Sequence, residues 1–156
     1  MSSVISVILE VIKSLLIVVA ASWVTVRFSL RRFYTEKWWE RKAQAYSKVI
    51  GSLARMRMYF DRWMEELIEH RVMSGEEKEK FEKEYRLARE VIKNAVAVGS
   101  FILSEEAAHI LEAFLKQLEE EHIRHDWLKD IERHYGQATE CIIRLREIAK
   151  KDLRKR

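Results

Sequence analysis

Histidine and cysteine side chains are the groups in this chain best suited to metal binding or nucleophilic chemistry, and the sequence holds five histidines and one cysteine. Two residue pairs, Glu106–His109 and Glu119–His122, have the Glu-x-x-His spacing of carboxylate-bridged metal bundles. Such a site needs the motif on two facing helices, whereas both pairs fall within one expected helix. His122 and His125 lack the second cysteine or histidine pair of a structural zinc site. The spacing therefore predicts no native metal centre.

Covalent catalysis and cofactor binding find no better support in the sequence. Cys141 lies beside an apolar line with no matched base, which is typical of a buried and inert thiol. The four glycines form no phosphate-binding loop, and the sequence contains no nucleophile elbow. A single cysteine excludes an internal disulfide and fits a reducing compartment. We expect a protein that is not an enzyme and uses neither a cofactor nor a small-molecule substrate.

The element with the strongest sequence signal is the apolar run at residues 4–28. About 20 apolar residues in a helix cross the hydrocarbon layer of a bilayer, so this run is long enough to span it. No Lys or Arg precedes the run, whereas Arg27, Arg31 and Arg32 cluster at its C-terminal end. This polarity is opposite to that of a cleaved signal peptide. It predicts a signal anchor with its N-terminus outside and its arginine-bearing end in the cytoplasm, with Trp23 in the inner interfacial belt.

Two ionisable residues, Glu10 and Lys13, interrupt the apolar run. They lie three residues apart and so share a helix face, close to which Ser6 and Ser14 also fall. On one interpretation Glu10 lies near the outer interface and Lys13 extends its ammonium group to water, because a mid-helix charge costs only about 3 kcal/mol on insertion. On the other interpretation both charges meet partners in neighbouring copies of the chain.

The rest of the chain is polar, helical in pattern and free of proline. With only four glycines it has too few turn residues for a β-rich fold, which predicts an all-α fold. We expect a transmembrane helix at residues 1–28 and a cytoplasmic antiparallel four-helix bundle at residues 29–156. The first helix of that bundle, from about Tyr34 to Val72, is expected to be much longer than the others.

Each expected bundle helix carries one apolar line at spacings of three and four residues. Ser74 and Glu77 have the spacing of a capping box for the second helix, and Ser104 begins the third helix after an interruption at residues 99–100. The heptad spacing in the last helix would allow packing against a second copy of the chain or within an internal core. The apolar lines of the other three helices favour the internal core. The lines are Trp39, Ala43, Tyr46, Ile50, Leu53, Phe60, Met64 and Leu67, with Arg57 as the polar interruption; Phe81, Tyr85, Ala88, Ile92, Ala95 and Gly99; Ala107 or Ala108, Leu111, Leu115, Leu118 and His122; and Leu128, Ile131, Tyr135, Ala138, Ile142, Leu145 and Ala149.

Basic charge is concentrated next to the expected anchor and at the C-terminus. Residues 27–73 hold 11 Lys and Arg against 6 Asp and Glu, and residues 127–156 hold 9 against 5, whereas residues 74–126 hold 8 against 13. If the four helices alternate in direction, the tail returns toward the bilayer, where its cations would contact anionic lipid. No basic stripe with interleaved aromatic residues is visible, which argues against nucleic-acid binding. The tail cations singled out are Lys150, Lys151 and Arg154.

Three segments resemble those of an uncharacterised family of small bacterial single-pass membrane proteins: FYTEKWWERKAQAY at residues 33–46, GSFILSEEA at residues 99–107, and IAKKDL at residues 148–153. The resemblance covers most of the chain and assigns no catalytic or binding residue. It implies a bacterial inner-membrane protein with a helical cytoplasmic domain. Within the first segment the adjacent Trp38 and Trp39 face different directions on a helix, so Trp39 fits the core line and Trp38 suits the membrane surface or a partner.

We therefore expect a membrane-anchored, non-enzymatic helical module that docks a cytoplasmic protein partner or self-associates at the inner membrane. The alternative is an oligomeric membrane-perturbing effector or small channel, whose copies associate through the polar face that includes Glu10 and Lys13. The residues expected to contact the membrane or a partner are Glu10, Lys13, Trp23, Arg27, Arg31, Arg32, Trp38, Trp39, Lys150, Lys151 and Arg154.

Overall fold

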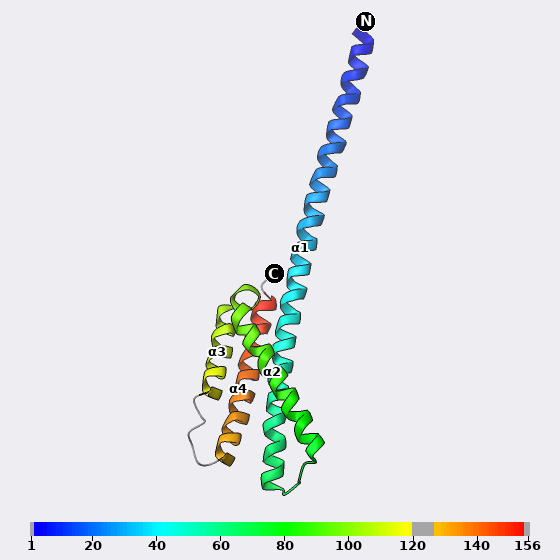
Figure 1. Cartoon of the computed structure of the whole chain (residues 1–156). Helices are drawn as coiled ribbons and strands as arrows, with labels where there is room; N and C mark the ends of the chain where they lie inside the picture. Colours follow the sequence, from blue (N-terminus) through cyan, green and yellow to red (C-terminus); the bar gives the residue numbers. More distant parts are fainter. Residues whose placement is uncertain (1, 120–126, 155–156) are drawn as a thin grey trace. The chain divides into compact units, whose positions relative to one another are not determined.

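The computed structural model describes residues 2–119 and 127–154, and the side chains at 2–14, 17, 20, 30–32 and 100 lie outside this description. All regular structure in the described part is α-helical, which confirms the predicted all-α class. The helices, labelled in Figure 1, are α1 (Ser2–Ile68), α2 (Gly75–Ile102), α3 (Glu105–Glu119) and α4 (Trp127–Arg154).

The longest element, α1, joins the predicted anchor and the predicted first bundle helix into one helix of 67 residues. The chain has no proline that would break it. This helix ends at Ile68 rather than at the predicted Val72, because the chain leaves the helix through His70, whose φ of 55° lies in the left-handed region. The capping box that then begins α2 is as predicted: the Glu77 N–H donates to Ser74 Oγ over 3.2 Å, and the Ser74 N–H donates to the Glu77 carboxylate over 3.0 Å.

The chain divides into two compact units, Met1–Glu40 and Arg41–Arg156, and α1 contributes residues to both. The predicted boundary between 1–28 and 29–156 marks the end of the apolar run and stays a prediction. Among the described residues, no helical stretch combines the length and the apolar character that crossing a bilayer requires. The side chains at 2–14, 17 and 20, which make up much of the predicted anchor, are not among those described.

The second unit is a helical bundle in which helices adjacent in sequence run antiparallel, as predicted (Figure 1). Beside the α1–α2 connection, Lys78 Nζ lies 2.7 Å from Glu66 Oε1. Farther from this connection, Tyr59 stacks on Tyr85 with ring centroids 4.5 Å apart. With distance from the connection, the residue numbers of the contacting pairs fall along α1 and rise along α2, so the two helices are antiparallel.

All four helices contribute to one core inside this unit. The predicted lines of α2, α3 and α4 supply their most buried residues, and Phe114, Cys141 and Ile148 join them. On α1 the buried line contains Val49 and Met56, and the expected Ile50 and Arg57 are half-buried beside it, because the face that meets the other helices is rotated by part of a turn from the expected one. Side chains with no exposed surface in this core are Leu53, Met56, Ala88, Ile92, Ala107, Leu111, Ala138 and Leu145.

The predicted interruption of α2 at residues 99–100 is wrong, because the helix continues through Gly99 to Ile102. Gly99 is buried, and a Cβ atom added there would lie 3.3 Å from the Cβ of Ala108 on α3. This glycine therefore permits a close approach of two helices rather than a break in one. The break follows at Leu103 and Ser104, and Ser104 begins α3 as predicted, accepting a hydrogen bond from the Ala107 N–H over 3.4 Å.

Candidate functional site

The first unit, Met1–Glu40, presents large apolar side chains that nothing in the unit covers. Their exposed fractions run from 45% for Val24 to 68% for Phe28. An apolar helix surface of this kind is stable only when a non-polar medium or a partner covers it. The residues that form this surface, called here the apolar collar, are Leu15, Leu16, Val18, Val19, Trp23, Val24, Val26 and Phe28.

Two predicted site residues of the first unit interact with each other. The Arg27 guanidinium lies 5.2 Å from the ring centroid of Trp23, a cation–π geometry, and Trp23 is 61% exposed. The pair places a charge beside an amphipathic ring at the end of the apolar collar, an arrangement suited to a boundary between non-polar and aqueous surroundings. The side chains of the remaining predicted residues in this stretch, Glu10, Lys13, Arg31 and Arg32, lie outside the described residues.

The adjacent tryptophans of the first unit are exposed, Trp38 by 47% and Trp39 by 42%. The prediction that Trp39 lies in the core is therefore wrong. Trp39 belongs to the unit that ends at Glu40, whereas the core cluster begins along α1 at Ala45 and Tyr46. Burial along α1 begins at Tyr46, which is 1% exposed.

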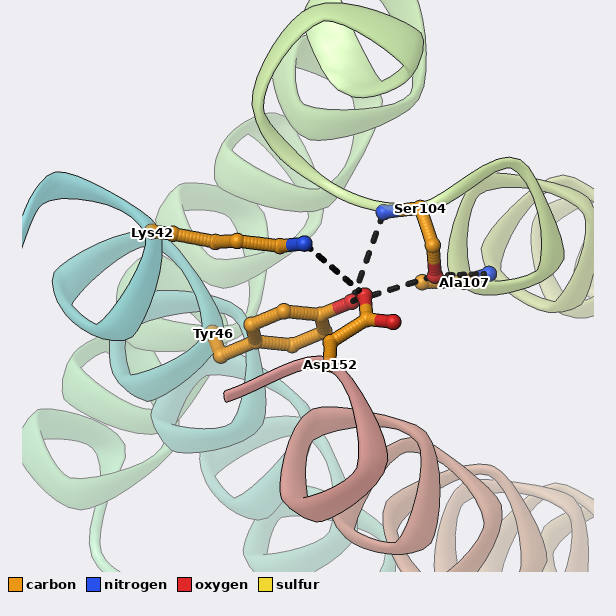
Figure 2. Close-up of polar contacts among 5 residues, drawn as sticks. All are labelled: Lys42, Tyr46, Ser104, Ala107 and Asp152. Atoms are coloured by element: carbon orange, nitrogen blue, oxygen red, sulfur yellow. Dashed lines mark hydrogen bonds and ion pairs between the residues drawn. The ribbon is translucent and has the colours of Figure 1, made fainter. Parts of the chain in front are cut away.

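A polar cluster joins three helices at the end of the bundle where α1 enters it (Figure 2). Tyr46 Oη donates a hydrogen bond to Asp152 Oδ2 over 2.5 Å, and Lys42 Nζ lies 3.3 Å from the same oxygen. The Ser104 N–H donates to Tyr46 Oη over 3.4 Å, and the two hydroxyl oxygens are 3.2 Å apart. The cluster thus ties α1 to the last turn of α4 and to the connection between α2 and α3.

The electrostatics of the cluster favour an ionised Asp152 beside a neutral Tyr46. Partial burial raises the pKa of the Asp152 carboxyl, but hydrogen bonds from Tyr46, Ser104 and Lys42 outweigh it and hold that pKa below its ordinary value. Burial, followed by the hydrogen bond to the Asp152 carboxylate, raises the pKa of Tyr46. The phenol therefore stays a donor to the carboxylate throughout the neutral range.

Chemically, this arrangement fastens helices together. Tyr46 is 1% exposed and donates its hydroxyl proton in a hydrogen bond to Asp152. The Asp152 side chain is 13% exposed and interacts with both Tyr46 and Lys42. Such groups are held in place by their neighbours rather than presented to a substrate. We assign the cluster a structural role.

Sequence reasoning missed this cluster, although it had placed each member in a local role. Tyr46 was assigned to the core line, Ser104 to a helix start and Asp152 to a charged tail. One signal could have found it: the segments at residues 33–46, 99–107 and 148–153, singled out by the resemblance, each supply members. The structure brings these three distant segments together at one end of the bundle (Figure 2).

The predicted tail residues Lys150, Lys151 and Arg154 are exposed on the last turns of α4. The Tyr46–Asp152 hydrogen bond places these turns beside the residues of α1 that enter the bundle. Within the second unit, α4 therefore ends beside the residues at which α1 enters the bundle. The return of this tail to a bilayer stays a prediction.

The residues considered for metal or thiol chemistry are spread over the bundle. Cys141 is buried, as predicted, and burial raises the pKa of its thiol to about 12. His109 lies 3.9 Å from Glu112, and both side chains are largely exposed. Within residues 2–119 and 127–154, no three His, Cys, Asp or Glu side chains converge on a point, while His122 and His125 lie outside the described residues.

Comparison with known proteins adds no assignment: no family model, curated protein or solved structure matches this chain.

Proposed function

We propose that this chain is a non-enzymatic helical interaction module held at a bacterial inner membrane by the N-terminal part of α1, with its N-terminus outside and its bundle in the cytoplasm. The observation that carries the proposal is the apolar collar, whose side chains are exposed on every side of the helix. A lipid bilayer is the surrounding that suits a helix apolar all round, because each side chain then meets hydrocarbon.

The sequence on either side of the collar supports this proposal. Residues 4–28 continue the apolar composition toward the N-terminus, and Arg27, Arg31 and Arg32 follow it with positive charge. Flanking Lys and Arg favour the cytoplasmic side of a membrane. The bundle supports the second half of the proposal, because its polar cluster at Tyr46, Asp152 and Lys42 holds helices together rather than forming a reactive site.

The proposal is tested by expressing the full chain in a bacterium and washing the membranes with alkaline carbonate, which removes peripheral proteins. The chain should remain in the pellet, and a reporter fused to Arg156 should be active only in the cytoplasm. Replacing Leu16 and Val19 together by arginine should release the chain, because each mid-membrane arginine costs about 2.5–3.5 kcal/mol. A matched control, Met58→Arg at a bundle residue that is 51% exposed, should leave the chain in the pellet.

Three results would overturn the proposal: release of the unaltered chain by carbonate, a mature form that begins beyond Ser22, or a reporter active outside the cell. The channel alternative depends on Glu10, Lys13, Ser6 and Ser14, whose side chains lie outside the described residues, and it stays a prediction.

A further inference from the structure

Helix α2 carries two apolar faces, and only one of them packs into the bundle. The packed face includes Ala88 and Ile92, which are fully buried. The other face is exposed: Leu87 by 51%, Val98 by 54% and Phe101 by 76%. Sequence reasoning found the first face alone. We call the second face the outer stripe; it consists of Leu87, Val91, Asn94, Val98 and Phe101.

The outer stripe has the spacing of a coiled-coil seam. Its residues follow one another at intervals of four, three, four and three, which is the repeat that keeps one line of side chains facing a partner helix. In this register Val91 and Val98 occupy a positions, and Leu87, Asn94 and Phe101 occupy d positions. Because Val91 is half-buried and the d positions are exposed, the face is open for a helix laid along it.

A groove runs beside the outer stripe and widens the surface on which such a helix would rest. Val91, Asn94 and Val98 form part of its α2 wall, and Ala45, Lys48 and Val49 form its α1 wall. The groove has a volume of about 210 Å³, enough for one or two large side chains. A helix on the stripe would therefore contact both α2 and the edge of α1.

We infer that the outer stripe is a homodimer seam, occupied by α2 of a second copy of this chain. The central Asn94 favours this occupant over an unrelated apolar helix. Opposite an apolar partner the buried amide would lose its hydrogen bonds to water, whereas a carboxamide both donates and accepts and so pairs with its own copy. Because a lone carboxamide in an otherwise apolar seam is satisfied only when its counterpart lies opposite, Asn94 favours helices that pair in register.

The direction of pairing rests on the proposed function. Two chains anchored in one bilayer with the same orientation are related by a twofold axis along the membrane normal. With α2 aligned along that axis, the two α2 helices run parallel, so each stripe residue faces its own counterpart.

Charges beside the stripe complement each other in this arrangement. Lys48 and Arg55 are exposed two turns apart on one face of α1, and Lys48 lines the groove. Glu90 is exposed on α2, and at 3.6 residues per turn it lies on the side of the stripe opposite to Ala95 and Ile102, which line the groove. In a parallel pair this side of one α2 faces the partner's groove, so Glu90 of each copy faces the basic edge of α1 in the other.

The experiment is disulfide scanning of the full chain in bacterial membranes. Cysteines are introduced singly at 87, 91, 94, 98 and 101, with matched controls at the exposed neighbours Arg86, Lys93 and Ala97. The natural Cys141 is buried and stays silent under mild oxidation. Facing positions of a parallel seam meet the Cα separation of a disulfide, about 4.4–6.8 Å, so Asn94→Cys and Val98→Cys should give several-fold more cross-linked dimer than Lys93→Cys and Ala97→Cys.

Three further variants test the seam without disturbing the bundle core. In the Val98→Cys background, Asn94→Asp should lower cross-linking several-fold, because two carboxylates would then face each other. Glu90→Lys should also lower it, and adding Arg55→Glu should restore it. Unchanged cross-linking in the Asn94→Asp variant would contradict the assignment of Asn94 to the seam.

Equal cross-linking at stripe and control positions, or adducts whose mass is not that of a dimer, would overturn the inference; the second result would mean that a different protein occupies the stripe. Linking only in mixtures of Leu87→Cys with Phe101→Cys would overturn the parallel direction. Carbonate washing of the same membranes separates the two proposals: a chain retained but not cross-linked removes the seam alone, whereas a chain released removes the anchor.

Discussion

Both halves of α1 carry large apolar side chains, and the surroundings of those side chains are opposite. Between Leu15 and Phe28 the large apolar side chains that the structure describes are exposed, whereas between Tyr46 and Phe60 one line of them is buried by α2, α3 and α4. The difference is a matter of neighbours rather than of helix propensity, because both halves belong to one uninterrupted helix. An apolar side chain contributes to stability only where something covers it, so the first half requires a covering from outside the chain.

The largest effect expected from this comparison is on packing, and a pair of leucines on the same helix measures it. Leu53→Ala removes a fully buried side chain and should lower the free energy of unfolding of the bundle by about 2–5 kcal/mol. Leu16→Ala, at a residue 64% exposed, should leave that free energy unchanged. Hydrogen exchange of the α2–α4 amides in the full chain gives both values. Equal losses for the two variants would break the distinction between the halves.

The next effect lies where the buried half begins. Tyr46→Phe keeps the ring but removes the hydroxyl that donates to the Asp152 carboxylate, and it should cost about 1.5–3 kcal/mol, the usual range for a hydrogen bond to a charged group. Tyr34→Phe is the matched control, because Tyr34 lies in the exposed half of α1 and is 68% exposed. The same exchange measurement should show no loss for the control.

Acid titration sharpens this second prediction. The pKa of Asp152 is held below its ordinary value in the folded protein, so its contribution to stability is complete above the unfolded pKa of about 3.9 and is lost as the pH falls through the folded pKa. The Asp152→Asn variant should therefore be less stable than the natural chain at neutral pH and nearly equal to it at the acid end. Parallel stability profiles for the two chains would contradict the assignment.

Substitutions at two glycines compare a site where two helices touch with a site where an added side chain has room. Gly99→Val forces a branched side chain against Ala108 and should cost about 1–3 kcal/mol. Gly51→Ala, on α1 where an added Cβ meets nothing within 4 Å, should instead stabilise the helix by up to about 1 kcal/mol. Thermal unfolding of the two variants should shift in opposite directions, and a shift in the same direction would refute the assigned role of Gly99.

The smallest effect is expected just beyond the buried half of α1, at the capping box of α2. Ser74→Ala removes the oxygen that accepts from the Glu77 N–H and should cost about 1 kcal/mol. Ser74→Gly should cost only a few tenths of that, since glycine is tolerated at this position. Denaturant unfolding of the three chains gives the ranking, and a larger loss for glycine than for alanine would contradict the capping role.

Features that depend on neighbours in sequence were predictable, and those that depend on neighbours in space were not. The capping box at Ser74 and Glu77 and the core lines of α3 and α4 follow from local spacing. The sequence around Gly99 predicts a helix break because the actual constraint on this residue, the Cβ of Ala108, lies on another helix.

Dependence on neighbours in space also explains why the sequence alone does not reveal the polar cluster or the outer stripe. Lys42, Ser104 and Asp152 are far apart in the chain, and no local pattern links them. Leu87 and Val98 form a recognisable stripe only after the other face of α2 is seen to fill the core.

The inward orientation of Asp152 changes the effective charge of the chain terminus. In composition, residues 150–154 mix three cations with one anion. The carboxylate of Asp152 is paired with Tyr46 and Lys42 in the bundle, whereas Lys150, Lys151 and Arg154 are exposed to solvent. An approaching phosphate group therefore meets only positive charge on this turn. Its attraction to the turn will be stronger, and more sensitive to ionic strength, than the net charge of residues 150–154 suggests.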